Sequence, residues 1–249
     1  MNADIEKLKI IISGSDNIVF FGGAGVSTES GIPDFRSADG LYSETQPQSD
    51  RPEFAYPPET ILSHSFFMSY TEEFYRFYRE KMLYPDAKPN DAHKALAELE
   101  KRGKLKAVIT QNVDGLHTEA GSTNVLELHG SALRNICMSC KECYPIEKII
   151  NADGIPLCLC GGIIKPDVVL YKETLDPSVM AKATRAIYNA DTLIVGGTSL
   201  NVYPAAGMIN HYRGDKLILI NKSETPYDRY ADLIIRESIG LTLSEALKQ

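Results

Sequence analysis

The sequence has no apolar run that approaches the ~20 residues a helix needs to cross a lipid bilayer. Its first nine residues are charged and amphipathic, without the apolar core of a secretory signal peptide. It also has no excess of basic residues, because 26 Lys and Arg stand against 33 Asp and Glu, a formal net charge of −7. A chain with this charge has no general attraction to nucleic acid or to an anionic membrane. We therefore expect a cytoplasmic protein that binds neither directly.

Internal repeats and low-complexity tracts are absent as well, and 249 residues suit one large domain or one domain with a small insertion. Short buried strands alternate with amphipathic helices along the chain, with a long loop at 37–60. The expected strands are 17–21, 106–110, 125–128, 168–171, 192–195, 217–220 and 233–235. The expected helices are 4–13, 66–83, 91–102, 177–189, 203–212 and 241–248. This alternation predicts an α/β fold built on a doubly wound parallel sheet.

The first expected strand breaks directly into glycines. Apolar residues 18–21 are followed by Gly22, Gly23 and Gly25, where backbone amides can approach a phosphate closely because no side chain intervenes. Such a turn is typical of dinucleotide sites, but Thr28 stands where the dinucleotide fingerprint has its third glycine. The glycines alone therefore leave a simple tight turn equally open.

Four of the five cysteines form two close pairs, C-x2-C at Cys137 and Cys140 and C-x-C at Cys158 and Cys160. In a chain expected in a reducing compartment, such pairs favour tetrahedral zinc over disulfides. Four thiolates leave no open position for water, so the expected role of the metal is structural. Cys143 is a possible substitute ligand, and buried free thiols or a redox role are the alternatives.

Polar residues follow several expected strands, at the edge where open α/β sheets bind ligands. Residues 111–114 follow one strand, His129 another, and a second glycine-hydroxyl turn at 196–199 a third. Among the five histidines, His129 is the best placed for a general base, with an ordinary pKa of about 6.5. The alternative for Asp114 is a helix cap, and a single histidine after a strand is more often structural.

The string GAGVSTESGIPDFR at residues 23–36 resembles the signature of the sirtuins, the NAD-dependent protein deacylases. Further segments follow in the family's order, namely TQNVDGLH, LHG, the cysteine pairs, KPDVVLY, GTSLNVYPA and LIN. The resemblance runs from about residue 17 to 240. It implies a Rossmann-like domain beside a smaller zinc-ribbon-containing domain. It also implies that NAD is cleaved at its nicotinamide bond while a lysine's acetyl or similar small acyl group passes to ADP-ribose.

The resemblance assigns roles residue by residue. His129 would be the general base, and Asn112 would orient the ribose and nearby water. The implied cofactor contacts are Ala24, Thr28, Phe35, Arg36, Gln111, Val113, Asp114, His129, Thr198, Ser199, Asn221 and Ile239. The segment 168–171 would pair with an acetylated lysine-containing protein or peptide through backbone hydrogen bonds.

The expected large domain comprises 1–36, 90–130 and 165–249, and the small domain joins a helical part (37–89) to a zinc module (131–164). The alternatives are a protein ADP-ribosyltransferase on the same fold, an NAD-dependent dehydrogenase and a zinc-ribbon binding module. Asn221 stands where a dehydrogenase has an acidic ribose ligand, and the negative net charge disfavours the binding module. Sirtuins that remove succinyl or malonyl groups carry a Tyr-x-x-Arg pair that 66–83 lacks, so we expect acetyl-lysine as substrate. The oligomeric state is not indicated.

Overall fold

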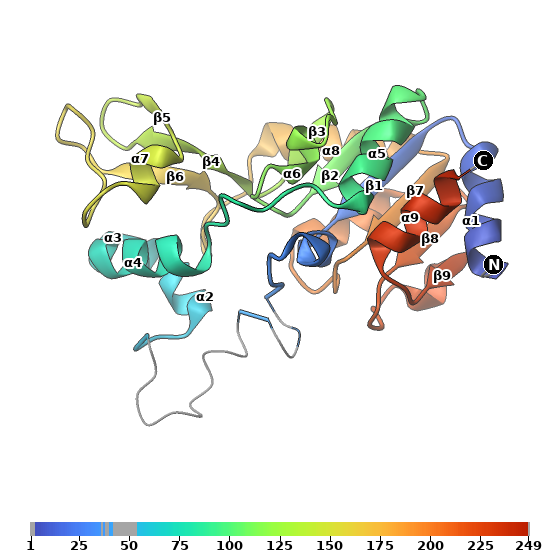
Figure 1. Cartoon of the computed structure of the whole chain (residues 1–249), viewed down its shortest axis with the longest axis horizontal. Helices are drawn as coiled ribbons and strands as arrows, with labels where there is room; N and C mark the ends of the chain where they lie inside the picture. The colour runs from blue at the N-terminus through green and yellow to red at the C-terminus, as the bar shows by residue number, and fades with distance from the viewer. Residues whose placement is uncertain (1–2, 36, 38–39, 42–53, 249) are drawn as a thin grey trace.

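The computed structural model describes residues 3–35, 37, 40–41 and 54–248 (Figure 1). Two β-sheets organise this part of the chain. The larger is parallel, with the strand order β3-β2-β1-β7-β8-β9, and the smaller is antiparallel, with the order β5-β4-β6. In Figure 1 the large sheet lies on the right beside both termini and the small sheet on the left. The predicted doubly wound sheet with a smaller second unit is confirmed.

The strands of the large sheet are mostly buried and apolar, although Lys106 is exposed and the edge strand at 125–127 is only half-buried. They are β1 (Ile18–Gly22), β2 (Leu105–Thr110), β3 (Val125–Glu127), β7 (Thr192–Gly196), β8 (Leu217–Ile220) and β9 (Leu233–Ile235). In β1, Ile18 and Phe20 join the core on one face, and Val19 and Phe21 join the core on the other. The chain runs outward from β1 to β3 and then returns to β7 on the other side of β1. Open α/β sheets bind ligands beside such a switch point.

Helices cover both faces of the large sheet. On one face lie α1 (Ala3–Ser13), α5 (Asp91–Lys101) and α9 (Ile239–Leu247). On the other lie α8 (Pro177–Asn189) and the 3-10 helix η3 (Ala205–His211), followed along the chain by η4 (Asp228–Tyr230). Within the described residues, no helix combines the length and the apolar character that crossing a membrane requires.

The small sheet shares one apolar core with the helices that precede it. Its strands are β4 (Gly130–Cys137), β5 (Cys143–Pro145) and β6 (Ile164–Val168), and the short helix α7 (Glu147–Ile150) lies between β5 and β6 in the chain. The preceding helices are α2 (Pro58–Ile61), α3 (His64–Ser69) and α4 (Thr71–Lys81). Polar contacts tie α4 to this sheet, because the Tyr75 hydroxyl donates to the Ile164 carbonyl. Arg79 Nε donates to the Ile149 carbonyl at 2.9 Å, and the guanidinium also reaches the Gly154 carbonyl.

Four sequence predictions differ from the structure. The helix expected at 66–83 is two helices, because Tyr70 leaves the helical region (φ −134°, ψ 51°) and α4 begins again at Thr71 with acidic residues in its first turn. The helix expected at 203–212 is the shorter 3-10 helix η3, and α2 begins within the loop expected at 37–60. The strand expected at 168–171 lies mainly earlier, as β6, with Tyr171 in a single bridge to Ser63.

Two histidines are buried between α5 and α6 (Leu116–Glu119). His93 Nδ1 accepts the Asn90 N–H at 3.2 Å and so caps α5. The ring centroid of His117 lies 4.7 Å from that of His93, and neither nitrogen of His117 has a hydrogen-bond partner among the described residues. Burial, with a smaller contribution from His93, lowers the pKa of His117 to about 3. His117 is therefore uncharged at neutral pH.

We expect the free energy of unfolding to fall as the pH drops from about 6.5 towards 3. The unfolded chain protonates His117 at its ordinary pKa of about 6.5, whereas the folded chain does so only near 3. The loss approaches about 1.4 kcal/mol per pH unit for this residue. Urea unfolding at pH 7 and 4.5 should show a smaller loss in His117→Phe than in the wild type. Exposed His211→Phe is the control, and identical losses in all three proteins would contradict the prediction.

Candidate functional site

Two glycine turns meet at the carboxyl end of the large sheet. The turn after β1 packs on the turn after β7, with the Gly25 N–H donating to the Gly197 carbonyl at 2.8 Å. A Cβ at Gly25 would lie 2.8 Å from Gly197 Cα, and one at Gly197 would lie 2.4 Å from the Val26 nitrogen. Gly197 also has a φ of +59°, in the left-handed region. Only glycine at both positions allows this contact.

These turns present unpaired backbone donors. Short 3-10 helices η1 (Ala24–Val26) and η2 (Thr28–Ser30) follow β1. The N–H groups of Ala24, Thr28, Thr198 and Ser199 donate to no acceptor among the described residues. Backbone N–H groups left free in turns beside a parallel sheet can bind an anion. This donor set fits the pyrophosphate of a dinucleotide.

The Ser27 side chain, 1% exposed, joins the first glycine turn to the loop after β2. Its hydroxyl donates to Asp114 Oδ2 at 2.7 Å and accepts from Asn112 Nδ2 at 3.0 Å. Asp114 Oδ1 also accepts the N–H of Leu116, the first residue of α6, at 2.9 Å. The N-cap of this helix is Gly115, so Asp114 is not the N-cap that its alternative interpretation expected. Sequence reasoning missed the central position of Ser27, although this residue lies within the string that carried the resemblance.

His129 lies between β3 and β4, and its backbone and ring are both held. Its Nδ1 lies 2.8 Å from the Gln111 carbonyl, which can only accept, so Nδ1 carries the proton. The Nε2 lone pair of the neutral ring is then the basic site. Burial lowers the pKa of His129 below its ordinary value, and the Gln111 hydrogen bond opposes part of that shift. The His129 carbonyl accepts the Val169 N–H at 3.0 Å.

Three other residues predicted for the site contact neighbouring loops or the core of the small sheet. Gln111 Nε2 donates to Thr198 Oγ1 at 3.1 Å, which links the loops after β2 and β7. The Val113 carbonyl accepts the Ala132 N–H at 2.9 Å, and the half-buried Phe35 packs against the small-sheet core.

Two of the predicted cofactor contacts follow the strands β8 and β9 along the chain. Asn221, at the end of β8, donates its side-chain amide to the Ser223 carbonyl at 2.8 Å. Ile239 is buried at the start of α9 against Gly196. Arg36 lies outside the described residues.

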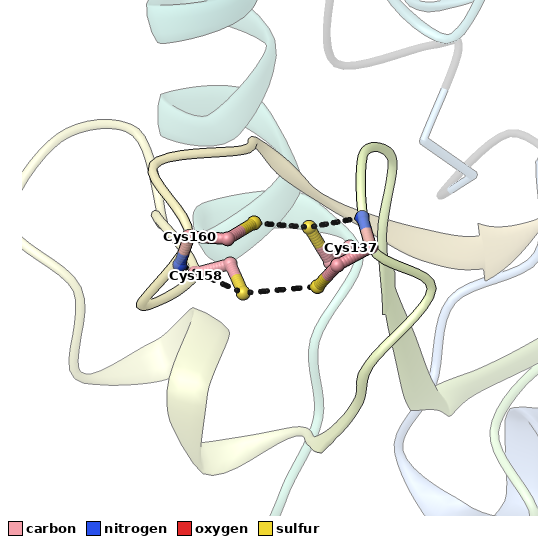
Figure 2. A group of neighbouring side chains, drawn as sticks. Cys137, Cys158 and Cys160 are labelled. Carbon is pink, nitrogen blue, oxygen red and sulfur yellow. Dashed lines mark hydrogen bonds between the residues drawn. The ribbon is translucent and has the colours of Figure 1, made fainter.

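The cysteine pairs converge as predicted. Their four sulfur atoms lie within 4.8 Å of one another, at Cys137, Cys140, Cys158 and Cys160. Figure 2 shows Cys137 facing Cys160, with an Sγ–Sγ distance of 3.5 Å. Zn–S bonds of about 2.3 Å place tetrahedral sulfurs about 3.8 Å apart, so the cluster fits zinc. Cys143 lies outside the cluster, whereas the Tyr144 hydroxyl, which sequence reasoning missed, lies 3.0 Å from Cys158 Sγ.

Comparisons with known proteins agree with this geometry. The model of the Sir2 family matches residues 23–204. A relative from Clostridium perfringens, named NAD-dependent protein deacetylase, is 59% identical over 99% of this chain and 100% of its own.

Two solved structures share the fold. One, described as the structural basis for the mechanism and regulation of Sir2 enzymes, is 39% identical with a TM-score of 0.87, covering 99% of this chain and 97% of its own. Another, described as Sir2-p53 peptide-NAD+, is 38% identical with a TM-score of 0.82, covering 98% of this chain and 96% of its own. The glycine turns, the His129 loop and the cysteine cluster thus occur in a chain that belongs to the Sir2 family.

Proposed function

We propose that the protein removes acetyl or similar small acyl groups from lysine side chains of other proteins, with consumption of NAD and release of nicotinamide and O-acetyl-ADP-ribose. The arrangement of His129 carries this proposal. The His129 Nδ1–H donates to the Gln111 carbonyl, so Nε2 is the basic nitrogen. The Gln111 side chain in turn donates to Thr198 in the second glycine turn, which connects His129 to the proposed anion site. The name of the Clostridium perfringens relative, NAD-dependent protein deacetylase, supports this proposal.

The residues around His129 would have separate roles in cofactor binding and proton transfer. The amides of Ala24, Thr28, Thr198 and Ser199 would hold the pyrophosphate of NAD. Once bound, NAD supplies the ADP-ribose that receives the acyl group. His129 Nε2 takes the proton of a ribose hydroxyl, for which a neutral imidazole is required.

Further contacts would orient the cofactor. Asn112 and Gln111 would position the ribose, and Asp114 with the Val113 backbone would accept from the nicotinamide amide. Phe35 would shield the reactive sugar face from water. Asn221 and Ile239 would contact the adenosine part, and Arg36 completes the proposed cofactor residues.

The segment 168–171 would pair with the substrate peptide, because it runs beside the His129 carbonyl at the margin of the small sheet. The solved relative described with a p53 peptide and NAD+ supports an acetylated protein or peptide as the substrate.

His129→Ala should lower kcat by roughly 10²-fold or more, because a positioned general base contributes on that scale. NAD should still bind, since the proposed pyrophosphate contacts are backbone amides. The assay detects deacetylated peptide and acetylated ADP-ribose by mass spectrometry, and NAD affinity is measured by calorimetry. Exposed His211→Ala is the matched control.

The pH profile provides a second readout of the same assignment. Neutral His129 is the active form and burial lowers its pKa, so kcat/KM should fall only as the pH drops through a value below 6.5. Near-normal turnover in His129→Ala, or an acid limb centred above 6.5, would remove His129 as the base.

We propose that zinc bound by Cys137, Cys140, Cys158 and Cys160 is structural. Four thiolates complete a tetrahedral shell, and Cys137 and Cys158 belong to the core shared with α4. The metal would therefore stabilise the small sheet and the helices packed on it.

Cys140→Ser should lose zinc and lower the melting temperature, because the metal contributes to folding. Cys143→Ser is the matched control and should keep the zinc and the wild-type melting temperature, since Cys143 lies outside the cluster. Elemental analysis and thermal unfolding make the comparison. A wild-type protein purified without zinc, or zinc loss in Cys143→Ser, would refute the assignment.

The preferred acyl group is proposed to be uncharged. The two arginines of α4 have other partners. Arg76 lies 3.7 Å from Glu73 and above the Phe54 ring, and Arg79 donates to backbone carbonyls in α7 and in the loop after it. Neither is placed to grip a buried acyl carboxylate bidentately.

On one peptide, kcat/KM should be at least ~100-fold lower with succinyl-lysine than with acetyl-lysine, because an unpaired buried carboxylate costs several kcal/mol. Steady-state rates on the two peptides test this. Equal or faster turnover of the succinyl form would mean that another cation lines the acyl pocket.

A further inference from the structure

The segment after β6 is fixed between the His129 loop and the start of α3. The Val169 N–H donates to the His129 carbonyl at 3.0 Å. Two residues later, the Tyr171 N–H donates to the Leu62 carbonyl at 2.9 Å, and the Tyr171 carbonyl accepts the His64 N–H at 3.0 Å. Side chains that leave this segment therefore start from a defined backbone beside the proposed peptide site.

The carboxylates that flank this segment, Asp167 and Glu173, already have cationic partners. Glu173 accepts from Lys165 Nζ at 3.1 Å and from the Leu170 N–H at 2.9 Å, and its other oxygen lies 2.8 Å from His64 Nδ1. Asp167 is paired with Arg134 at 3.0 Å. Neither carboxylate is left to balance a further cation.

Lys172 is that further cation. It is exposed, and its ammonium has no carboxylate partner among the described residues, only the Ser65 hydroxyl at 3.4 Å. Its φ of 72° places it in the left-handed region that a lysine rarely adopts. Its own N–H has no acceptor within the described part of the chain. The residue next to the proposed peptide segment thus carries an uncompensated charge.

We propose that Lys172 gives the enzyme a preference for acetylated peptides with an acidic side chain within two positions of the acetyl-lysine. The inference rests on the proposed function, because it takes 168–171 as the segment that pairs with the peptide. An exposed ion pair is weak and screened by salt, so the preference is modest and depends on ionic strength.

The experiment uses acetyl-lysine peptides that are identical except at one position, which carries Glu, Gln or Lys. Each of the two positions on either side of the acetyl-lysine is varied in turn. At low ionic strength we expect kcat/KM to rank Glu above Gln above Lys at one or more positions, with about two- to five-fold per step. The difference should lie in KM for the peptide, leave KM for NAD unchanged, and shrink in 0.5 M NaCl.

Two variants and one control complete the test. Lys172→Gln should abolish the ranking, and Lys172→Gly should do the same while favouring the left-handed backbone. Lys101→Gln, an exposed lysine on α5, should keep it. Equal turnover of all peptides by the wild type, or a ranking that survives in both Lys172 variants, overturns this inference alone. No deacetylation of any peptide overturns the proposed function, and the inference with it.

Discussion

The contact between the glycine turns after β1 and β7 is the constraint on which the site depends. At 2.8 Å from Gly25 N to Gly197 O, the two backbones touch without an intervening side chain. The amides of Ala24 and Thr198, one in each turn, have no acceptor among the described residues. The contact between the turns also brings Ser27 into reach of the loop after β2. The proposed anion site and the loop after β2 are therefore joined by direct hydrogen bonds.

His129 connects this assembly to the small sheet. It is followed by Gly130, whose φ of +77° turns the chain into β4 and whose Cβ, if present, would lie 2.0 Å from the Asp167 carbonyl. The same turn brings Val169 to the His129 carbonyl. His129, the proposed base, and the proposed peptide segment are thus joined by a backbone hydrogen bond, so a displacement of β6 would also displace His129.

Much of the fold could be predicted from the sequence, because all six strands of the large sheet lie in short, largely apolar segments bounded by turn residues. β4 could not, since its burial is irregular, with Leu133 and Arg134 exposed in mid-strand. The break at Tyr70 leaves no Pro or Gly as a signal. The cysteine cluster was predictable from spacing, because metal ligands recur at fixed intervals. The Ser27 hydrogen bonds were not, because they join residues 87 and 85 positions apart.

The pairing of β1 with β7 also determines when the sheet can be completed during synthesis. Ile18 to Gly22 lie beside Thr192 to Gly196, so the first strand gains its second neighbour only after most of the chain has been made. At ribosomal speeds of about 5–20 residues per second, that interval is roughly ten to thirty seconds. Until β7 is made, β1 lacks a partner strand on that side, and an unpaired strand edge is a template for aggregation. The large sheet can therefore be completed only late in translation, once β7 has been made.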